Sequence, residues 1–116
     1  MNSEETLLSC LQQLNDEEVL RLQKIVREVE GSRHQECFIL GTYLAQINQL
    51  EEALDLLAIA VGGDPKNSDY HCNLGVVEHK LNLLETAKLS LQLSIQLNPQ
   101  NTDALYNLGK VYKDLN

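Results

Sequence analysis

Aromatic residues and proline are scarce in this 116-residue sequence: it has no tryptophan, one phenylalanine, four tyrosines and two prolines. Hydrophobic residues nevertheless make up 43% of the chain, so its core must be built mainly from Leu, Ile, Val and Ala. A core of that composition is typical of packed helices. The sequence also has no apolar run of 18 residues, which argues against a membrane-spanning helix.

Positive charge is scarce as well. Nine Lys and Arg against seventeen Asp and Glu give a formal net charge of −8, and most of the excess lies in residues 1–67. This balance argues against nucleic acid or an anionic membrane surface as a partner. Three scattered cysteines form no C-x-x-C motif, and no basic region precedes the first apolar residues. We therefore expect reduced thiols, no secretory signal and a cytoplasmic protein.

The sequence also lacks the short motifs of common enzyme classes, including a P-loop, G-x-G-x-x-G, H-E-x-x-H and G-x-S-x-G. His71, Cys72, Glu78 and His79 share one predicted helix, but they do not supply zinc ligands one turn apart on one face. We interpret His71 as a packing residue. A nucleophilic pair of Cys72 and His79 would lack an orienting third group. We expect no catalytic activity and no bound metal or cofactor.

What the sequence does contain is an internal repeat with a period of 34 residues. The segment NLGVVEHKL at residues 73–81 returns as NLGKVYKDL at residues 107–115. Two complete units, 34–67 and 68–101, precede a partial unit, 102–116. The complete units match at Leu40, Gly41, Ala53, Leu57 and Pro65 in the first and at Leu74, Gly75, Ala87, Leu91 and Pro99 in the second.

Each complete unit reads as two helices, because apolar residues recur at helical spacing in both of its halves. Leu40, Leu44 and Ile47 lie on one face of the first helix. Turns between the two helices are expected at Asn48 and Asn82. The prolines close each unit, since proline removes a backbone donor and restricts the residue before it.

Glycine falls inside the first predicted helix of every unit, at Gly41, Gly75 and Gly109. Glycine within a helix costs about 1 kcal/mol relative to alanine, and close approach of a neighbouring helix is the usual compensation. We therefore expect the second helix of each unit to pack tightly over these glycines, with Ala53, Ala60, Ala87 and Ser94 supplying small surfaces for that contact.

This pattern resembles the tetratricopeptide repeat, whose signature at period 34 is W-x2-L-G-x2-Y, A-x3-F and P. The three units carry it as Cys37-x2-Leu40-Gly41-x2-Leu44, His71-x2-Leu74-Gly75-x2-Glu78 and Leu105-x2-Leu108-Gly109-x2-Tyr112. At most of the positions where the signature has Trp or Tyr, this sequence has a residue that is not aromatic. The resemblance implies an all-α fold in which antiparallel helix pairs stack as a short right-handed superhelix. It also implies a module that binds a peptide or a partner helix in a concave groove.

Residues 1–33 do not fit the repeat but still read as helical. Ser3 begins one predicted helix, Asn15 and Glu18 resemble a capping box that opens a second, and Gly31 is a plausible C-cap. We expect this pair to cap an array formed by residues 34–116, with a separate interaction module as the alternative. The partial third unit further suggests a fragment of a larger protein.

In the family, the first helix of each unit lines the concave face. Carried onto this chain, those positions include Cys72 and the predicted binding face, defined as Phe38, Ile39, Thr42, Asn73, Val76, His79, Lys80, Tyr106, Asn107, Lys110 and Lys113. Only the asparagines match the Lys, Asn and Arg clamp of the chaperone-binding members, so no carboxylate clamp is expected. Asn73 and Asn107 can both donate and accept hydrogen bonds, which suits them to bind the extended backbone of a ligand. The lysines beside apolar residues suggest a ligand with apolar and acidic side chains, unless the lysines are simply solvated.

An assembly module is the alternative function. Leu105, Leu108, Tyr112 and Leu115 form an apolar stripe on the last predicted helix, 102–115. Exposed stripes of this kind tend to find partners. The chain could therefore form a homo-oligomer through this helix, or act as a regulatory module packed on an adjoining catalytic domain.

Overall fold

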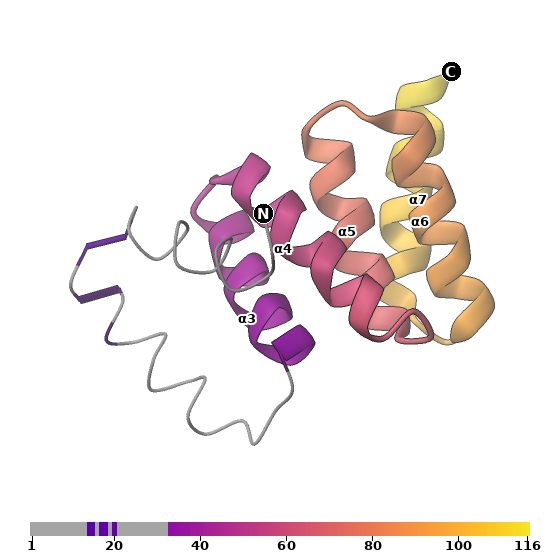
Figure 1. The fold of residues 1–116 in the computed structure, drawn as a ribbon. Coiled ribbons are helices and arrows are strands. Elements are labelled where there is room, and N and C mark those ends of the chain that lie inside the picture. Colours follow the sequence, from indigo (N-terminus) through magenta and orange to yellow (C-terminus); the bar gives the residue numbers. More distant parts are fainter. Residues whose placement is uncertain (1–13, 16, 19, 21–32) are drawn as a thin grey trace. The chain divides into compact units, whose positions relative to one another are not determined.

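The computed structural model describes residues 14, 15, 17, 18, 20 and 33–116. Residues 33–116 form helices and no strand (Figure 1). The helices are α3 (Arg33–Gln46), α4 (Leu50–Gly63), α5 (Ser68–Lys80), α6 (Leu84–Leu97) and α7 (Thr102–Leu115). The chain divides into two compact units, Met1–Gly63 and Asp64–Asn116, which are described separately below as unit 1 and unit 2. The predicted all-α fold of packed helix pairs is confirmed for these residues.

In unit 1, α3 and α4 pack against each other along the face that the sequence predicts. Leu40 and Leu44 of α3 and Ala53 and Leu57 of α4 are buried. A Cβ atom on Gly41 would lie 3.0 Å from Leu57 Cγ, so the expected close approach is present. Ile47 was expected on the same face, and that prediction is wrong: α3 ends at Gln46, which leaves Ile47 exposed in the turn.

The turns within the two helix pairs depend on asparagine. Asn48 and Asn82 have φ values of 67° and 63°, in the left-handed region that asparagine tolerates better than most residues. The amide that follows each of them returns to the preceding helix. Gln49 N donates to Leu44 O at 2.8 Å, and Leu83 N donates to Glu78 O at 2.8 Å. The predicted turns are confirmed, with helix-terminating geometry.

Two further asparagines begin α5 and α7. Asn67 Oδ1 accepts a hydrogen bond from Tyr70 N at 3.2 Å, and Asn101 Oδ1 accepts one from Ala104 N at 3.1 Å. An asparagine in this position satisfies a backbone donor that would otherwise lack a partner in the first turn. Because both follow a proline by two residues, the helix starts expected just beyond Pro65 and Pro99 are confirmed.

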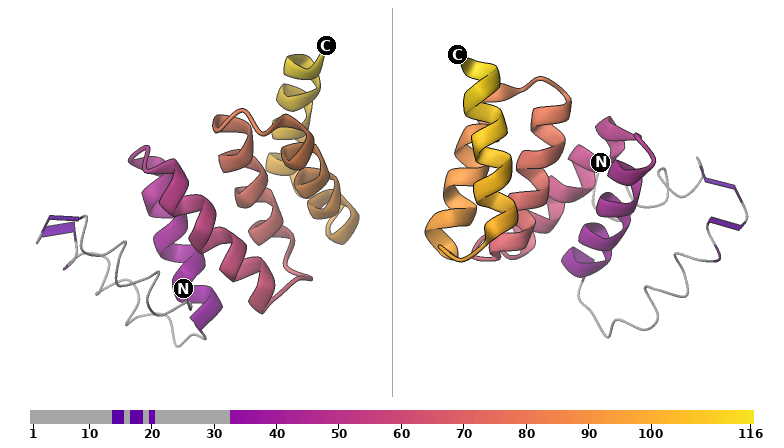
Figure 2. Two further views of the ribbon diagram at one scale, coloured as in Figure 1. Left: turned by 45° about the horizontal axis from the view of Figure 1, so that its top comes forward. Right: turned by 180° about the vertical axis from the view of Figure 1, so that it is seen from behind.

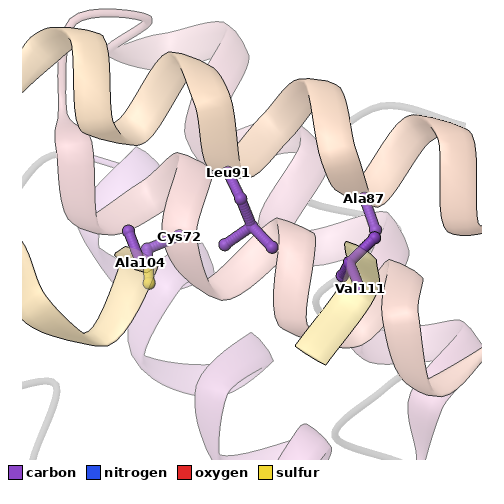
Figure 3. Packing of buried hydrophobic residues seen from close by; sticks show 5 residues of the cluster. All are labelled: Cys72, Ala87, Leu91, Ala104 and Val111. Atoms are coloured by element: carbon purple, nitrogen blue, oxygen red, sulfur yellow. The ribbon is translucent and has the colours of Figure 1, made fainter. Parts of the chain in front are cut away.

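The core of unit 2 lies between three helices. Helix α6 contacts both α5 and α7, and the two views of Figure 2 show it alongside both. Leu91 lies between Cys72 and Ala104 on one side and Ala87 and Val111 on the other (Figure 3). Ile95, Leu108 and Leu115 pack against this cluster from its edges. Replacing such a fully buried leucine with alanine typically costs 2–5 kcal/mol of stability.

A buried polar junction joins the starts of α5 and α7 to the end of α6. Asn101 Nδ2 donates to Ser68 Oγ at 2.9 Å and lies 3.3 Å from both Ser94 Oγ and Asp69 Oδ1. Ser94 Oγ in turn donates to Ser68 O at 2.8 Å. Ser94 is fully buried, so its hydroxyl needs these partners. The asparagine that caps α7 therefore also ties it to the preceding helix pair.

Two positions where the repeat signature expects an aromatic residue hold buried polar side chains instead. His71 is 7% exposed, and its Nε2 donates to Pro65 O at 2.8 Å. The interpretation of His71 as a packing residue is therefore incomplete, because the imidazole also holds the loop before α5. Glu78 is 9% exposed and accepts a 2.5 Å hydrogen bond from Ser90 Oγ of α6. The hydrogen bond compensates for the desolvation of the carboxylate.

Of the region before α3, the structure describes the predicted capping box. Glu18 N donates to Asn15 Oδ1 at 2.8 Å, and Asn15 N donates to Glu18 Oε2 at 3.1 Å. This reciprocal pair is the arrangement that the sequence predicted. The predicted helix start at Ser3, the C-cap at Gly31 and most of the proposed cap lie outside the described residues. Within the described part of the chain, no helix combines the length and apolar character needed to cross a membrane.

Candidate peptide-binding surface

The predicted binding face is divided between the two units. Phe38, Ile39 and Thr42 lie on α3 in unit 1, and the other eight residues lie on α5 and α7 in unit 2. On α3 the three side chains are partly exposed and alternate with the buried residues that face α4. They therefore lie beside the core of unit 1 rather than within it.

In unit 2 a contact between His79 and Asp114 joins the C-terminal ends of α5 and α7. His79 Nε2 lies 2.5 Å from Asp114 Oδ2. This predicted face residue is therefore already engaged with a neighbouring helix. The pairing could have been suspected from the sequence, because the two residues hold adjacent positions in successive repeats. Single-helix patterns give no sign of it.

The three predicted lysines gather around this contact. Lys80 follows His79 in the chain, Lys113 precedes Asp114, and Lys110 lies one turn before Asp114 on α7. All three are exposed and form no ion pair with the described residues. Cations near helix C-termini also complement the negative end of the helix dipole. The result is a local concentration of positive charge in an otherwise acidic chain.

Tyr106 is the most exposed aromatic side chain of α7, at 70%. Lys110 Nζ lies 5.3 Å from the centre of its ring, within the range of a cation–π interaction. Asn107, beside it, donates from Nδ2 to Asp103 O at 2.7 Å within the same helix. Part of its hydrogen-bonding capacity is therefore already used. Asn73 holds the equivalent position on α5 and is partly exposed.

Cys72 does not belong to this surface, although the family positions include it. It is buried in the core cluster beside Ala104 of α7. Burial, with smaller contributions from Asp103 and Asp69, raises the pKa of its thiol from 9.0 to about 11. Burial also raises the pKa of Cys37. Because the thiolate is the nucleophilic form, these thiols are poorly suited to covalent chemistry. Among the described residues, no group of three or more His, Cys, Asp and Glu side chains is placed to hold a metal ion.

Comparison with known proteins identifies the repeat. Residues 68–101, the second complete copy of the predicted 34-residue repeat, match the family described as Tetratricopeptide repeat. Among solved structures, the crystal structure of MamA matches with a TM-score of 0.70 and 24% sequence identity. The match covers 81% of this chain and 54% of the MamA chain, so the chain spans about half the length of that protein. No curated protein matches the sequence significantly. Residues 68–101 are a tetratricopeptide repeat, as their pattern predicted, and the part of the chain that the MamA match covers shares the fold of that protein.

Proposed function

We propose that this chain is a protein-interaction module, without catalytic activity of its own, that binds a peptide or a partner helix along its predicted binding face. The observation that carries the proposal is the two-sided character of α7. Ala104 and Val111 face the core, while Tyr106, Lys110 and Lys113 project into solvent. A helix that is anchored on one side and displays large side chains on the other suits ligand recognition.

The chemistry of this surface suggests a ligand with apolar and acidic side chains. Tyr106 and the partly exposed Val76 offer apolar contacts, and Lys80, Lys110 and Lys113 offer positive charge. Exposed ion pairs contribute only about 0.2–1 kcal/mol each, so the lysines would mainly influence specificity and association rate. On this proposal residues 34–116 form a superhelical array capped by residues 1–33, in a cytoplasmic protein.

The test begins by recovering partners with the intact chain and mapping the bound segment as a synthetic peptide. Two double variants are then compared at two salt concentrations: Asn73→Ala with Asn107→Ala, and Lys80→Glu with Lys110→Glu. Lys66→Glu is the matched charge control, because Lys66 is exposed in the loop before α5 and lies outside the face. We expect both double variants to bind more weakly than the control, the lysine pair chiefly at low salt. Parental affinity in both folded variants would place the ligand elsewhere.

An assembly module is the second candidate, favoured by apolar exposure on a different side of α7. Leu108 and Leu115 of the predicted stripe pack on the core, whereas Leu105 and Tyr112 are 48% and 42% exposed. A homo-oligomer through this helix would give a sedimentation coefficient that rises with protein concentration. Mutation of the lysine cluster would leave that association unchanged, which separates this function from peptide binding.

A further inference from the structure

Residues 89–97 of α6 have a sequence pattern that does not fit the helix they form. We call them the alternating segment, because they read LSLQLSIQL, with apolar and polar residues in strict alternation. A period of two residues is that of a β-strand with one apolar face, whereas an amphipathic helix repeats its apolar residues every 3.6 positions. The pattern is not a property of the repeat, since the corresponding residues 55–63 of α4 read DLLAIAVGG.

As a helix, the alternating segment exposes leucines and buries serines. Its exposed leucines are Leu89 (58%), Leu93 (45%) and Leu97 (39%). Ser90 and Ser94 are buried, as is Leu91, while Ile95 packs against the core cluster from its edge. Helix α6 lies against both α5 and α7. The helical state of this segment therefore depends on the contacts that its buried residues make with those two helices.

An extended strand would separate the two kinds of side chain completely. Successive side chains of a strand point to opposite faces, so the five apolar residues would form one face and the serines and glutamines the other. Hydrophobic patterning largely decides between helix and strand where no tertiary contact overrides it. The alternating segment thus favours a helix in the folded chain and a strand once unit 2 has lost its packing.

The alternating segment is also uncharged, in a chain with a net charge of −8. No Asp, Glu, Lys or Arg occurs between Lys88 and Asp103. Electrostatic repulsion between two acidic chains is therefore weakest here. Short uncharged segments without proline are typical of cross-β assembly, and a flanking charge or proline limits its extent. Lys88 and Pro99 flank this segment on its two sides.

We propose that the alternating segment pairs, as a β-strand, with the same segment of a second copy of this chain when unit 2 unfolds. In the folded chain, the packing of Leu91 in the core cluster keeps the segment helical. Loss of that packing releases a strand whose apolar face matches its own copy. A second copy is the partner because identical strands stack with like side chains in register, and these strands carry no charge that would separate them.

The test uses the intact chain at the temperature at which half of the molecules are unfolded. Assembly is followed by thioflavin T fluorescence and by the infrared amide band of β-structure. Each variant is measured at its own midpoint, so that differences in stability do not affect the comparison. We expect the parent chain to assemble, and we expect the protease-resistant part of the product, identified by mass spectrometry, to contain residues 89–97.

Two variants change exposed positions of α6 and leave its buried residues intact. The exchange of Gln92→Leu with Leu93→Gln preserves composition and charge but breaks the alternation, so it should abolish the β-structure signal. Leu93→Lys places a charge on the apolar face of the strand and should also abolish it. Leu105→Lys is the matched control, because Leu105 is similarly exposed but lies on α7. Circular dichroism below the midpoint shows that each variant folds.

Several results would overturn the proposal. They are undiminished assembly of the exchange variant, a protease-resistant part that excludes residues 89–97, and a parent chain without β-structure at its midpoint. Association of the folded chain that Leu93→Lys abolishes, with no β-structure signal, would make the exposed leucines a native interface and would also overturn it. Helix α6 contributes no residue to the predicted binding face, so failure here leaves the proposed function intact.

Discussion

The Cγ atom of Leu91 lies within 2.7 Å of the position that a Cβ atom on Gly75 would occupy. Real Cβ atoms do not approach so closely, so the packing of α6 on α5 depends on the absence of a side chain at residue 75. The equivalent distance in unit 1, from Gly41 to Leu57 Cγ, is 3.0 Å. At Gly109 the expected close approach is absent, because a Cβ atom there would meet no neighbouring atom within 4 Å among the described residues. One repeat position thus has three different steric environments.

These environments predict a graded response to the same substitution. Gly75→Ala should destabilise the chain by about 1–3 kcal/mol, because overpacking exceeds the gain in helix propensity, and Gly41→Ala should cost less. Gly109→Ala should stabilise α7 by up to about 1 kcal/mol. Urea unfolding of the three variants measures the order of their free energies of unfolding. Equal effects at all three glycines would contradict the packing described here.

The two capping asparagines provide a second matched comparison. Asn67→Ala removes one cap and should cost about 0.5–2 kcal/mol. Asn101→Ala should cost more, because it also removes the donor to Ser68 and leaves the buried Ser94 hydroxyl with fewer partners. Denaturant unfolding of both variants tests the difference. Asn101→Asp keeps the cap but replaces the amide donor with a carboxylate oxygen about 3.3 Å from Asp69 Oδ1, so it should not restore the stability of the parent.

The buried pair of Glu78 and Ser90 should show strong coupling. Ser90→Ala alone leaves the carboxylate without its 2.5 Å donor, and should cost about 1–3 kcal/mol. Adding Glu78→Leu should recover that loss, because apolar replacement of a buried polar pair is often neutral or stabilising. Leu44 occupies the same repeat position in unit 1 and is fully buried, so leucine suits the site. A double-mutant cycle with additive single effects would refute the coupling.

The raised pKa of Cys72 predicts both low reactivity and alkaline sensitivity. With a pKa of about 11 in the folded state against 9.0, the thiol stays protonated in the fold at pH values where it ionises in the unfolded chain. Its contribution to stability is therefore complete below pH 9 and is lost as the pH rises toward 11. Cys72→Ala should show a smaller alkaline loss of stability than the parent. Alkylation of Cys72, followed by peptide mass analysis, should be slow until the chain unfolds.

The features that sequence reasoning predicted correctly depend on a single helix or a single turn. The buried side of α3 at Leu40 and Leu44, the turns at Asn48 and Asn82 and the capping box at Asn15 follow from local periodicity and local hydrogen bonding. Exposure depends instead on which helix lies alongside. Cys72 and Tyr106 hold the same repeat position, yet one is buried beside α7 and the other is 70% exposed.

Contacts between helices of different repeats were the hardest to predict. The pairing of His79 with Asp114 joins residues 35 positions apart, and it requires knowing how α7 lies against α5. The apolar stripe on the last helix is partly uncovered, as expected, but the sequence did not show which of its residues would be covered: Leu108 and Leu115 face the core, while Leu105 and Tyr112 do not. The 3.6-residue period of an α-helix shows which side of the helix is apolar, but it does not show which residues at the boundary of that side are covered by a neighbouring helix.

The polar junction at Asn101 also determines how α7 is rotated about its own axis. Each residue of an α-helix turns the chain by about 100°, so a slip of one position would carry a different set of side chains toward α5. Apolar contacts define this rotation less sharply, because the burial of apolar surface is not directional. The hydrogen bonds from Asn101 to Ser68 and Ser94 are directional and have no equivalent one residue away. Hydrogen bonds at the start of α7 thereby constrain which residues its far end presents to solvent.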